Sequence, residues 1–404
     1  MNTSMQPKTH NGVKIRKCFL LLLLATVFPI HSVDAQFLLD SCLNMPRKGD
    51  CLMKQRVTYK QPGDKGVQKI WDIRDLNPID ENYELKYSSL GENRDHLVGI
   101  EHSTMYYYQM HGDSLLLSGY ENPTTLMKFH ESEVLLIFPF AYGCVFTDYF
   151  DGIGSYCNRL NIHVQGKSTV SADATGMLLL STGDTLRHVM RVHTQKDIVE
   201  QMRFIIKNDS LLADSTSFIL NRDSINWHLA HDSICIRTDT WRWYAEGYRY
   251  PVFESIKSSI CALGKWQDYL TVSFYYPPQE QYYGLEDDLE NRIQREKVVE
   301  SGNNFRSPSP RSDGKGNAYE DDLIRYSYEL DSEGNLQFHY VLMQDADVTI
   351  GLYDLQGRQL TVSRTFSRPI SSYSVLLPLS ENPSGKYLLR ISVGDKVYGE
   401  KIIK

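Results

Sequence analysis

The chain has 404 residues, of which 41% are hydrophobic and 23% are charged, and its formal net charge at pH 7 is −7. Nucleic acids and anionic membrane surfaces are negatively charged, so the acidic balance argues against both as partners. The length is sufficient for two or three domains of about 100 to 200 residues each.

Residues 1–35 have the three parts of a secretory signal peptide. A positive region without acidic residues is followed by an apolar run from Phe19 to Phe28 and by the small residue Ala35 at the expected cleavage site. The positive residues are Lys8, Lys14, Arg16 and Lys17. The apolar run is far shorter than the roughly 20 residues that span a membrane. We therefore expect the inner-membrane export machinery and signal peptidase to act on this segment, leaving a mature chain that begins at Gln36.

A second cleavage site is the alternative. The segment Leu39–Cys42 loosely matches a lipoprotein box and would leave a lipidated Cys42. Asp40 fits this box poorly, and Cys42 lies well beyond the apolar run, so cleavage after Ala35 is favoured. Loss of residues 1–35 removes four basic residues and one acidic residue, which changes the net charge from −7 to −10.

The mature chain would contain an even number of cysteines, which suggests disulfide bonds in an exported protein. These are Cys42, Cys51, Cys144, Cys157, Cys235 and Cys261. The sequence leaves the connectivity open; the simplest arrangement pairs neighbours along the chain, Cys42 with Cys51, Cys144 with Cys157 and Cys235 with Cys261. No two cysteines have the C-x-x-C spacing, which argues against a zinc or redox motif.

Residues 36–278 predict a β-rich cargo region. Runs of Tyr, Val, Ile, Leu and Thr are separated by turns of Gly, Pro and Asp, and no window has the long 3.6-residue period of a helical domain. The clearest strands are Met105–Gln109, Ser114–Tyr120, Val134–Phe140 and Arg187–His193. We therefore expect an all-β fold whose larger part resembles a β-sandwich.

Residues 279–321 predict a charged, disordered linker. Its first part, to Lys297, has an apolar residue at every fourth position, which favours a short helix. Its second part, Ser301–Glu320, consists mainly of Ser, Asn, Pro, Gly and Arg and has few side chains to bury. We expect a domain boundary here.

Residues 322–404 predict a small immunoglobulin-like β-sandwich. Val348, Ile350 and Leu352 alternate with smaller or polar residues, which places one apolar face against a partner sheet. The Asp331–Asn335 segment between two apolar runs predicts a hairpin loop. In the segment from Asp354, a turn with Gly357 at positive φ is expected.

Four blocks near the C-terminus occur in a characteristic order and spacing. They are Val348–Arg358, Leu377–Leu379, Ser384–Ile391 and Lys401–Lys404. Together they resemble the type A C-terminal sorting domain of type IX secretion cargo. The matching positions are Tyr353, Asp354, Gly357, Arg358, Gly385, Tyr387, Lys401 and Lys404.

This resemblance implies transport through an outer-membrane type IX translocon to the cell surface or the medium, where the domain is often removed or replaced by a surface attachment. Without a translocon the protein would remain periplasmic. The alternative is an immunoglobulin-like module that has no sorting role.

The sequence contains few candidate catalytic or metal-binding residues. His188 and His193, with Asp184 nearby, are five positions apart on an expected strand and point to opposite faces, so they do not form a metal site without a bulge. Cys144 with His163 could act as nucleophile and base, but a disulfide is favoured for Cys144. No serine-hydrolase, zinc-protease or phosphate-loop motif is present. We expect no metal and no cofactor.

Trp241 and Trp243 share one face of an expected strand, and flat aromatic surfaces suit glycan binding. The alternative places both in a β-sandwich core. We expect an exported, non-enzymatic surface or secreted protein, with a binding module for a glycan as one form. The alternative function is a secreted hydrolase acting on glycan or peptide through scattered carboxylates such as Glu101, Asp151 and Glu254.

Overall fold

The computed structural model describes residues 37–89, 95–182, 184–205, 220–285, 287–300, 319–320, 323–355, 357–394 and 396–404. The predicted signal peptide and most of residues 301–321 lie outside these ranges. Strands account for 64% of the described residues and helices for 9%, so the all-β prediction is confirmed.

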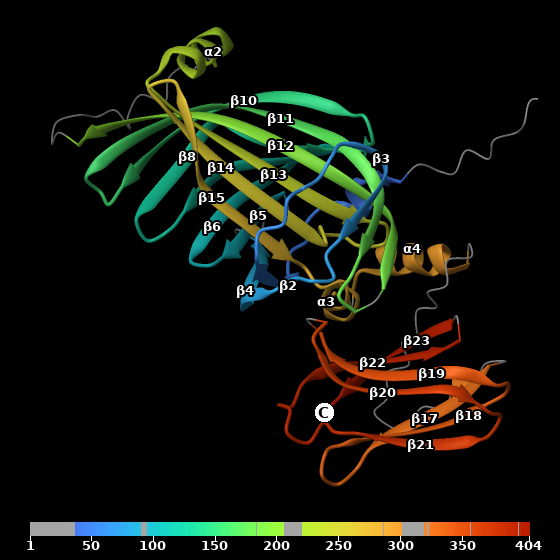
Figure 1. The fold of residues 1–404 in the computed structure, drawn as a ribbon. Coiled ribbons are helices and arrows are strands. Elements are labelled where there is room, and N and C mark those ends of the chain that lie inside the picture. The colour runs from blue at the N-terminus through green and yellow to red at the C-terminus, as the bar shows by residue number, and fades with distance from the viewer. Residues whose placement is uncertain are drawn as a thin grey trace, which may run out of the picture. The chain divides into compact units, whose positions relative to one another are not determined.

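The larger region forms one sheet of thirteen strands, twelve of which close into a barrel-like ring (Figure 1). Around the ring, these are β10 (Val145–Tyr156), β8 (Thr125–Ile137), β7 (Ser114–Glu121), β6 (Thr104–His111), β5 (His96–Glu101), β4 (Pro78–Ser89), β2 (Cys51–Val57), β15 (Lys265–Tyr275), β14 (Phe253–Ala262), β13 (Ile234–Ala245), β12 (Thr185–Phe204) and β11 (Leu160–Leu179). The pairing of β10 with β11 closes the ring, and β3 (Gly66–Asp72) pairs in parallel with β11. We call this region the closed sheet. Its closure is the architectural feature that the sandwich-like prediction did not contain.

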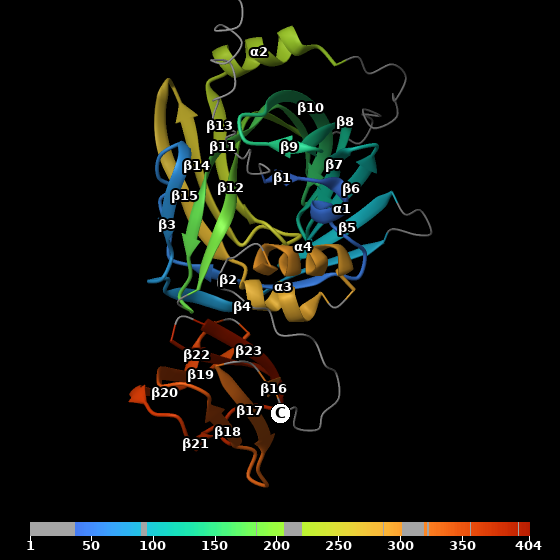
Figure 2. The same cartoon turned by 90° about the vertical axis from the view of Figure 1, so that its right-hand side faces the viewer.

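The short strands β1 (Leu38–Leu39) and β9 (Phe140–Ala141) identify the inner face (Figure 2). Tyr108 on β6 and Tyr244 on β13 are six strands apart around the ring, yet both pack against the cluster that contains Leu39 and Phe140. Only the inner face of a closed sheet can bring opposite strands to one cluster. Directly paired residues of an antiparallel sheet have their side chains on the same face. The strand pairing therefore shows which other residues lie on the inner face.

Among the described residues, four helices accompany this sheet: α1 (Ser41–Asn44), α2 (Arg222–His231), α3 (Pro278–Gly284) and α4 (Leu289–Glu300). The side chain of Asn221 caps α2 by accepting from the backbone N–H of Ser224, as short polar side chains do at this position. Helices α3 and α4 occupy the first part of the predicted linker, where buried Asn291 and Arg295 anchor α4, so this part is packed structure. Each helix in the described part of the chain is too short or too polar to cross a bilayer.

The C-terminal region is a sandwich of two four-stranded sheets. One contains β16 (Tyr319–Glu320), β17 (Ile324–Leu330), β18 (Leu336–Leu342) and β21 (Ser372–Leu377); the other contains β20 (Gln359–Arg368), β19 (Ala346–Asp354), β22 (Lys386–Val393) and β23 (Lys396–Ile403). A single apolar cluster lies between them, with Phe338 from one sheet and Leu352 from the other fully buried. The predicted sandwich and the hairpin around Asp331 are both confirmed.

Candidate functional site

The inner face of the closed sheet contains a layer of paired charges. Lys54 on β2 is almost fully buried and forms an ion pair with Glu101 on β5. Its Nζ also donates to the hydroxyl of Tyr276 (3.2 Å), which in turn donates to Glu254 on β14 (3.2 Å). Arg242 on β13 completes the chain, with its Nε 2.7 Å from a Glu254 carboxylate oxygen. We call these five residues the polar layer.

The register places the polar layer on the inner face. Arg242 pairs with Val192 of β12, which belongs to the inner cluster, and Glu254 pairs with Arg242. The Lys54 ammonium lies 4.2 Å from the centre of the Phe274 ring, which shields it from solvent and adds a cation–π contact. Two positive and two negative groups therefore neutralise one another within the sheet.

Tyrosines surround this layer. Ring pairs link Tyr87 to Tyr108 (6.1 Å between centroids) and Tyr106 to Tyr108 (6.4 Å). Burial, followed by the negative charge of Glu101, raises the pKa of Tyr106 to about 12. Burial also raises the pKa of Tyr244 and of Tyr276. These hydroxyls are therefore neutral at physiological pH and can donate hydrogen bonds.

Gly99 on β5 makes room for these rings. A Cβ atom at this position would lie 2.7 Å from Cε2 of Tyr108 and 3.3 Å from Cε1 of Tyr87. The first distance is below any ordinary van der Waals contact, so a side chain here would displace the Tyr108 ring. The aromatic arrangement on the inner face thus depends on a glycine.

Solvent reaches part of this inner face. The Arg242 side chain is 37% exposed and that of Glu101 is 20% exposed, although both point into the ring. Tyr106, Tyr108 and Tyr244 are only partly buried. The burial of Arg242 acts to lower its pKa, but the negative charge of Glu254 raises it overall, so the guanidinium stays charged. Charged and aromatic side chains that solvent can reach on the inner face of a closed sheet are suitable for binding a small ligand.

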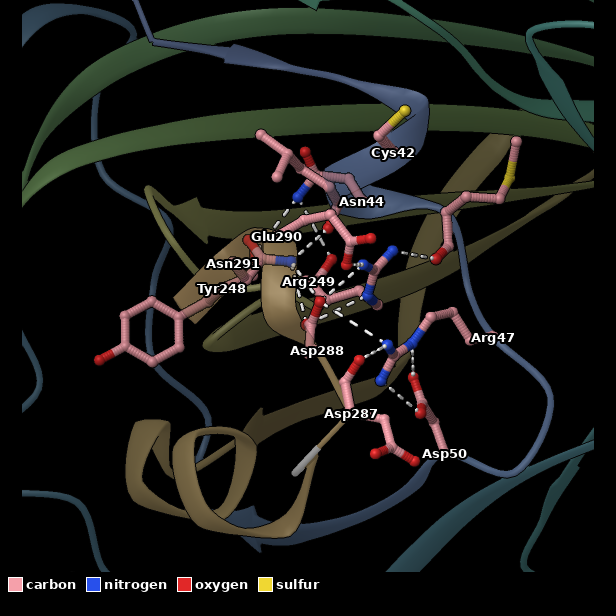
Figure 3. A network of polar contacts seen from close by, with 12 residues as sticks. Cys42, Asn44, Arg47, Asp50, Tyr248, Arg249, Asp287, Asp288, Glu290 and Asn291 are labelled. Carbon is pink, nitrogen blue, oxygen red and sulfur yellow. Dashed lines mark hydrogen bonds and ion pairs between the residues drawn. The ribbon is translucent and has the colours of Figure 1, made fainter. Parts of the chain in front are cut away.

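A second polar network lies beside α4 and has a structural explanation (Figure 3). The Arg249 guanidinium bonds both carboxylate oxygens of Asp288 (2.7 and 3.1 Å), and each side chain is 2% exposed. Asn291 donates to the carbonyl of Leu43 (2.8 Å), and Arg249 to that of Met45 (2.9 Å). These bonds attach the N-terminal segment to α4 and leave little of the charged groups accessible to a ligand.

The tryptophans predicted for glycan binding are not both available. Trp243 is 1% exposed and packs edge-on against Trp71, with ring centroids 5.9 Å apart, so it cannot stack on a glycan. Trp241 is partly buried and stacks on His193 at 4.8 Å. Both belong to the outer side of β13, where β3 and neighbouring segments cover the sheet.

His188 and His193 contact different acidic side chains. His193 lies 2.7 Å from Asp239, whereas His188 contacts Glu246. His163 contacts Asp151 on the outer side of β10, at 3.0 Å. Within the described ranges, no cluster of three or more His, Cys, Asp or Glu side chains could hold a metal ion.

The six cysteines in the described part of the chain are free thiols in this structure, so the disulfide prediction is not realised here. Cys144 and Cys157 flank the twelve residues of β10, which separates them by about 40 Å at the usual rise of a strand. A bond between these two is incompatible with the fold. Cys235 and Cys261 do lie directly opposite each other on β13 and β14. The Cys51 thiol donates to Glu84 (2.8 Å), and burial with this contact raises its pKa to about 12, which disfavours a reactive thiolate.

The residues of the sorting-domain resemblance gather at one end of the sheet that contains β19. The backbone N–H and the Nε of Arg358 donate to the Asp354 carboxylate (2.8 and 2.9 Å), and Gly357 has φ +85°, as the turn prediction requires. Asp354 pairs with Tyr387 at the start of β22.

Lys404 connects the remaining motif segments through hydrogen bonds. The backbone N–H of Lys404 donates to the carbonyl of Gly385 (3.0 Å), and its Nζ donates to the carbonyl of Leu379 (2.8 Å). Lys401 lies on β23 next to this end. Motif residues that are distant in the sequence therefore lie together at one end of this sheet.

The polar layer could not be identified from the sequence. Glu101 and Glu254 are recognisable there only as scattered acids, and Lys54 and Arg242 have no sequence signal, because their partners come from distant strands. An alternating strand with a charge at an apolar position was the one available hint: Lys54 follows Leu52 by two residues on β2.

Comparison with known proteins adds no family to this description: no protein-family model matches the chain, and a search of curated proteins finds no match.

Proposed function

We propose that this chain is an exported, non-enzymatic protein that binds a small ligand on the inner face of its closed sheet. The observation that carries the proposal is Arg242, a charged side chain that points into the ring and is still 37% exposed. Burying charge costs folding free energy, and a sequence selected for stability alone would place apolar residues here. The accessible tyrosines beside it supply flat surfaces and hydroxyl donors for the same ligand.

Catalysis is less well supported by this geometry. Glu101 is paired with Lys54, and Glu254 is paired with Arg242. A glycosidase needs one carboxyl group to be protonated and the other to act as a base or nucleophile, and pairing with a cation favours the ionised form. The same pairs are well suited to orienting polar groups of a bound molecule.

The binding proposal is tested by native mass spectrometry of protein purified from its own host. We expect a small molecule to co-purify with the wild type and to be released on denaturation. Tyr106→Ala should reduce the fraction of protein that carries this molecule. An aromatic contact contributes about 0.5 to 1.5 kcal/mol of binding free energy, which corresponds to a change in affinity of up to about tenfold.

Tyr107→Ala is the matched control. Tyr107 is the next residue on β6, points to the opposite face and donates to Glu121 (2.8 Å). Equal loss in both variants, or no bound molecule in the wild type, would contradict binding on the inner face.

The export part of the proposal rests on the two ends of the chain. The N-terminal segment has the composition of a signal peptide, and the C-terminal motif residues lie together at one end of the sheet that contains β19, as a recognition surface would require. We propose export across the inner membrane and sorting by a type IX translocon to the cell surface or medium.

Fractionation of the native host, with mass spectrometry of both protein ends, tests this route. A surface or medium species that begins near Gln36 and lacks residues 322–404 is the expected result. A periplasmic species that retains those residues in a host with a working translocon would refute sorting.

A further inference from the structure

Two neighbouring strands carry a block of polar side chains on the outer face of the closed sheet. Between β11 and β12, His163 pairs directly with Gln201, and Asn161 pairs with Arg203. His163 lies an odd number of residues before Val170, which belongs to the inner cluster, and the pairing is regular over this stretch, so His163 points outward. Its partner shares this face, as do Asn161 and Arg203, two residues further along their strands. We call His163, Asn161, Gln201 and Arg203 the outer polar block.

A cavity of about 190 Å³ lies at this block. Its lining includes the four residues of the outer polar block together with Ile153 on β10. A water molecule in the liquid occupies about 30 Å³, so the cavity has room for a group of several non-hydrogen atoms. Because the block faces outward, this cavity is separate from the proposed site on the inner face.

A buried carboxylate fixes the orientation of His163. Asp151 on β10 is 0% exposed, and its Oδ2 lies 3.0 Å from Nε2 of His163 and accepts a hydrogen bond from the side-chain amide of Gln165 (2.7 Å). With Nε2 held by this contact, the other ring nitrogen, Nδ1, points away from Asp151. An imidazole that takes up a second proton donates from both nitrogens. His163 can therefore offer a charged hydrogen bond to a ligand, which meets this donor and not the buried carboxylate.

Arg203 supplies a positive charge that has no acidic partner. Within the described ranges, no carboxylate forms an ion pair with Arg203, whereas Arg191 and Arg237 are each paired with an aspartate. The exposed guanidinium has donors arranged to bind two oxygens of one carboxylate or phosphate. The amides of Asn161 and Gln201 form no hydrogen bond with another side chain in the described part of the chain. The polar groups at this cavity are therefore available to a ligand.

From these observations we infer that the outer polar block binds a small organic anion, whose carboxylate or phosphate group lies between Arg203 and His163. The amides of Asn161 and Gln201 add neutral N–H donors beside this group. Ile153 provides an apolar contact for the remainder of the ligand. This inference does not depend on ligand binding at the inner face.

NMR titration of the mature chain, with isotope-labelled arginine and histidine side chains, tests the inference. Inorganic phosphate and acetate should each shift the side-chain signals of Arg203 and His163 in a saturable manner. Acetamide has nearly the shape of acetate but no charge, and it should leave both signals unchanged. The anion that binds more tightly identifies the preferred anionic group.

Two variants locate the anion. Arg203→Gln should weaken acetate and phosphate binding by about tenfold or more, as the loss of a hydrogen bond between charged groups does. His163→Gln keeps an amide donor for Asp151 but removes the imidazole, and it should weaken binding by a smaller factor. Arg187→Gln is the matched control, because Arg187 lies on the same strand, is exposed and is outside the cavity lining. Since Arg203 and Arg187 are both exposed, the unfolding midpoints of their variants should change little.

The outcomes are distinct from those for the inner face. Equal shifts with acetamide, the absence of a saturable shift with either anion, or equal weakening by Arg187→Gln would overturn the outer site. A molecule that Tyr106→Ala releases and an anion that Arg203→Gln releases are separate results, so either site can fail while the other stands.

Discussion

The closed sheet and the C-terminal sandwich bury different kinds of side chain. The sandwich core consists of Ile, Leu, Val, Phe and Tyr, with Phe338 and Leu352 fully buried between its two sheets. The inner face of the closed sheet instead contains Lys54, Glu101 and Arg242 among its tyrosines. A core that serves only to stabilise has no need of ion pairs, so these charges favour the closed sheet over the sandwich as the place where the proposed ligand binds.

The largest expected effect is in the apolar core. Phe338→Ala removes a fully buried ring and should destabilise the sandwich by about 3 to 5 kcal/mol, because of lost burial and the remaining cavity. Urea denaturation of the mature chain, with hydrogen exchange of β17 and β18, measures this change. Val341→Ala on the outer side of the same strand is the control and should change stability by less than about 0.5 kcal/mol.

The next effect tests the polar layer. Lys54→Met leaves Glu101 without its cation and should cost about 3 kcal/mol, at the low end for a buried pair because Glu101 keeps some solvent contact. The double variant Lys54→Met with Glu101→Gln should recover most of this loss. If the double variant is no more stable than the single one in chemical denaturation, the two groups are not coupled.

A smaller effect is expected at Gly99. Gly99→Ala should destabilise the closed sheet by about 1 to 3 kcal/mol, because its Cβ would overlap the Tyr108 ring. Gly284→Ala provides the comparison, since a Cβ there meets no atom within 4 Å. Thermal unfolding of both variants should show a lower midpoint for Gly99→Ala alone; equal midpoints would mean that the ring moves freely.

The smallest effect concerns an acid in the sandwich. Burial raises the pKa of Glu400 above its ordinary value of 4.5, partly opposed by hydrogen bonds from Tyr326 and Tyr328. The folded state therefore holds this proton more tightly than the unfolded chain does. Stability should fall as pH rises from the ordinary value through the raised one, and Glu400→Gln should flatten that dependence. Carbon-13 NMR titration of the carboxyl group measures the pKa, and a value at or below 4.5 would contradict the expectation.

Local patterns predicted much of this fold. Strands such as β6, β7 and β12, the Asp331 hairpin and the positive φ of Gly357 follow from alternation and turn chemistry, and the structure confirms them. The polar layer could not be predicted in the same way. Lys54 on β2 and Glu101 on β5 have two whole strands, β3 and β4, between them in the sequence, and their pairing depends on how the strands are ordered in the sheet.

The sequence by itself determined the all-β class and the sandwich of residues 322–404, because period-two alternation and glycine turns are properties of neighbouring residues. It also provided the export signals on which the proposed location depends. Only the tertiary structure decided that the larger region closes on itself, through the pairing of β10 with β11, and that Trp243 lies inside a core. Which face of a strand becomes the interior depends on contacts between distant residues, and the candidate binding site exists only after that choice is made.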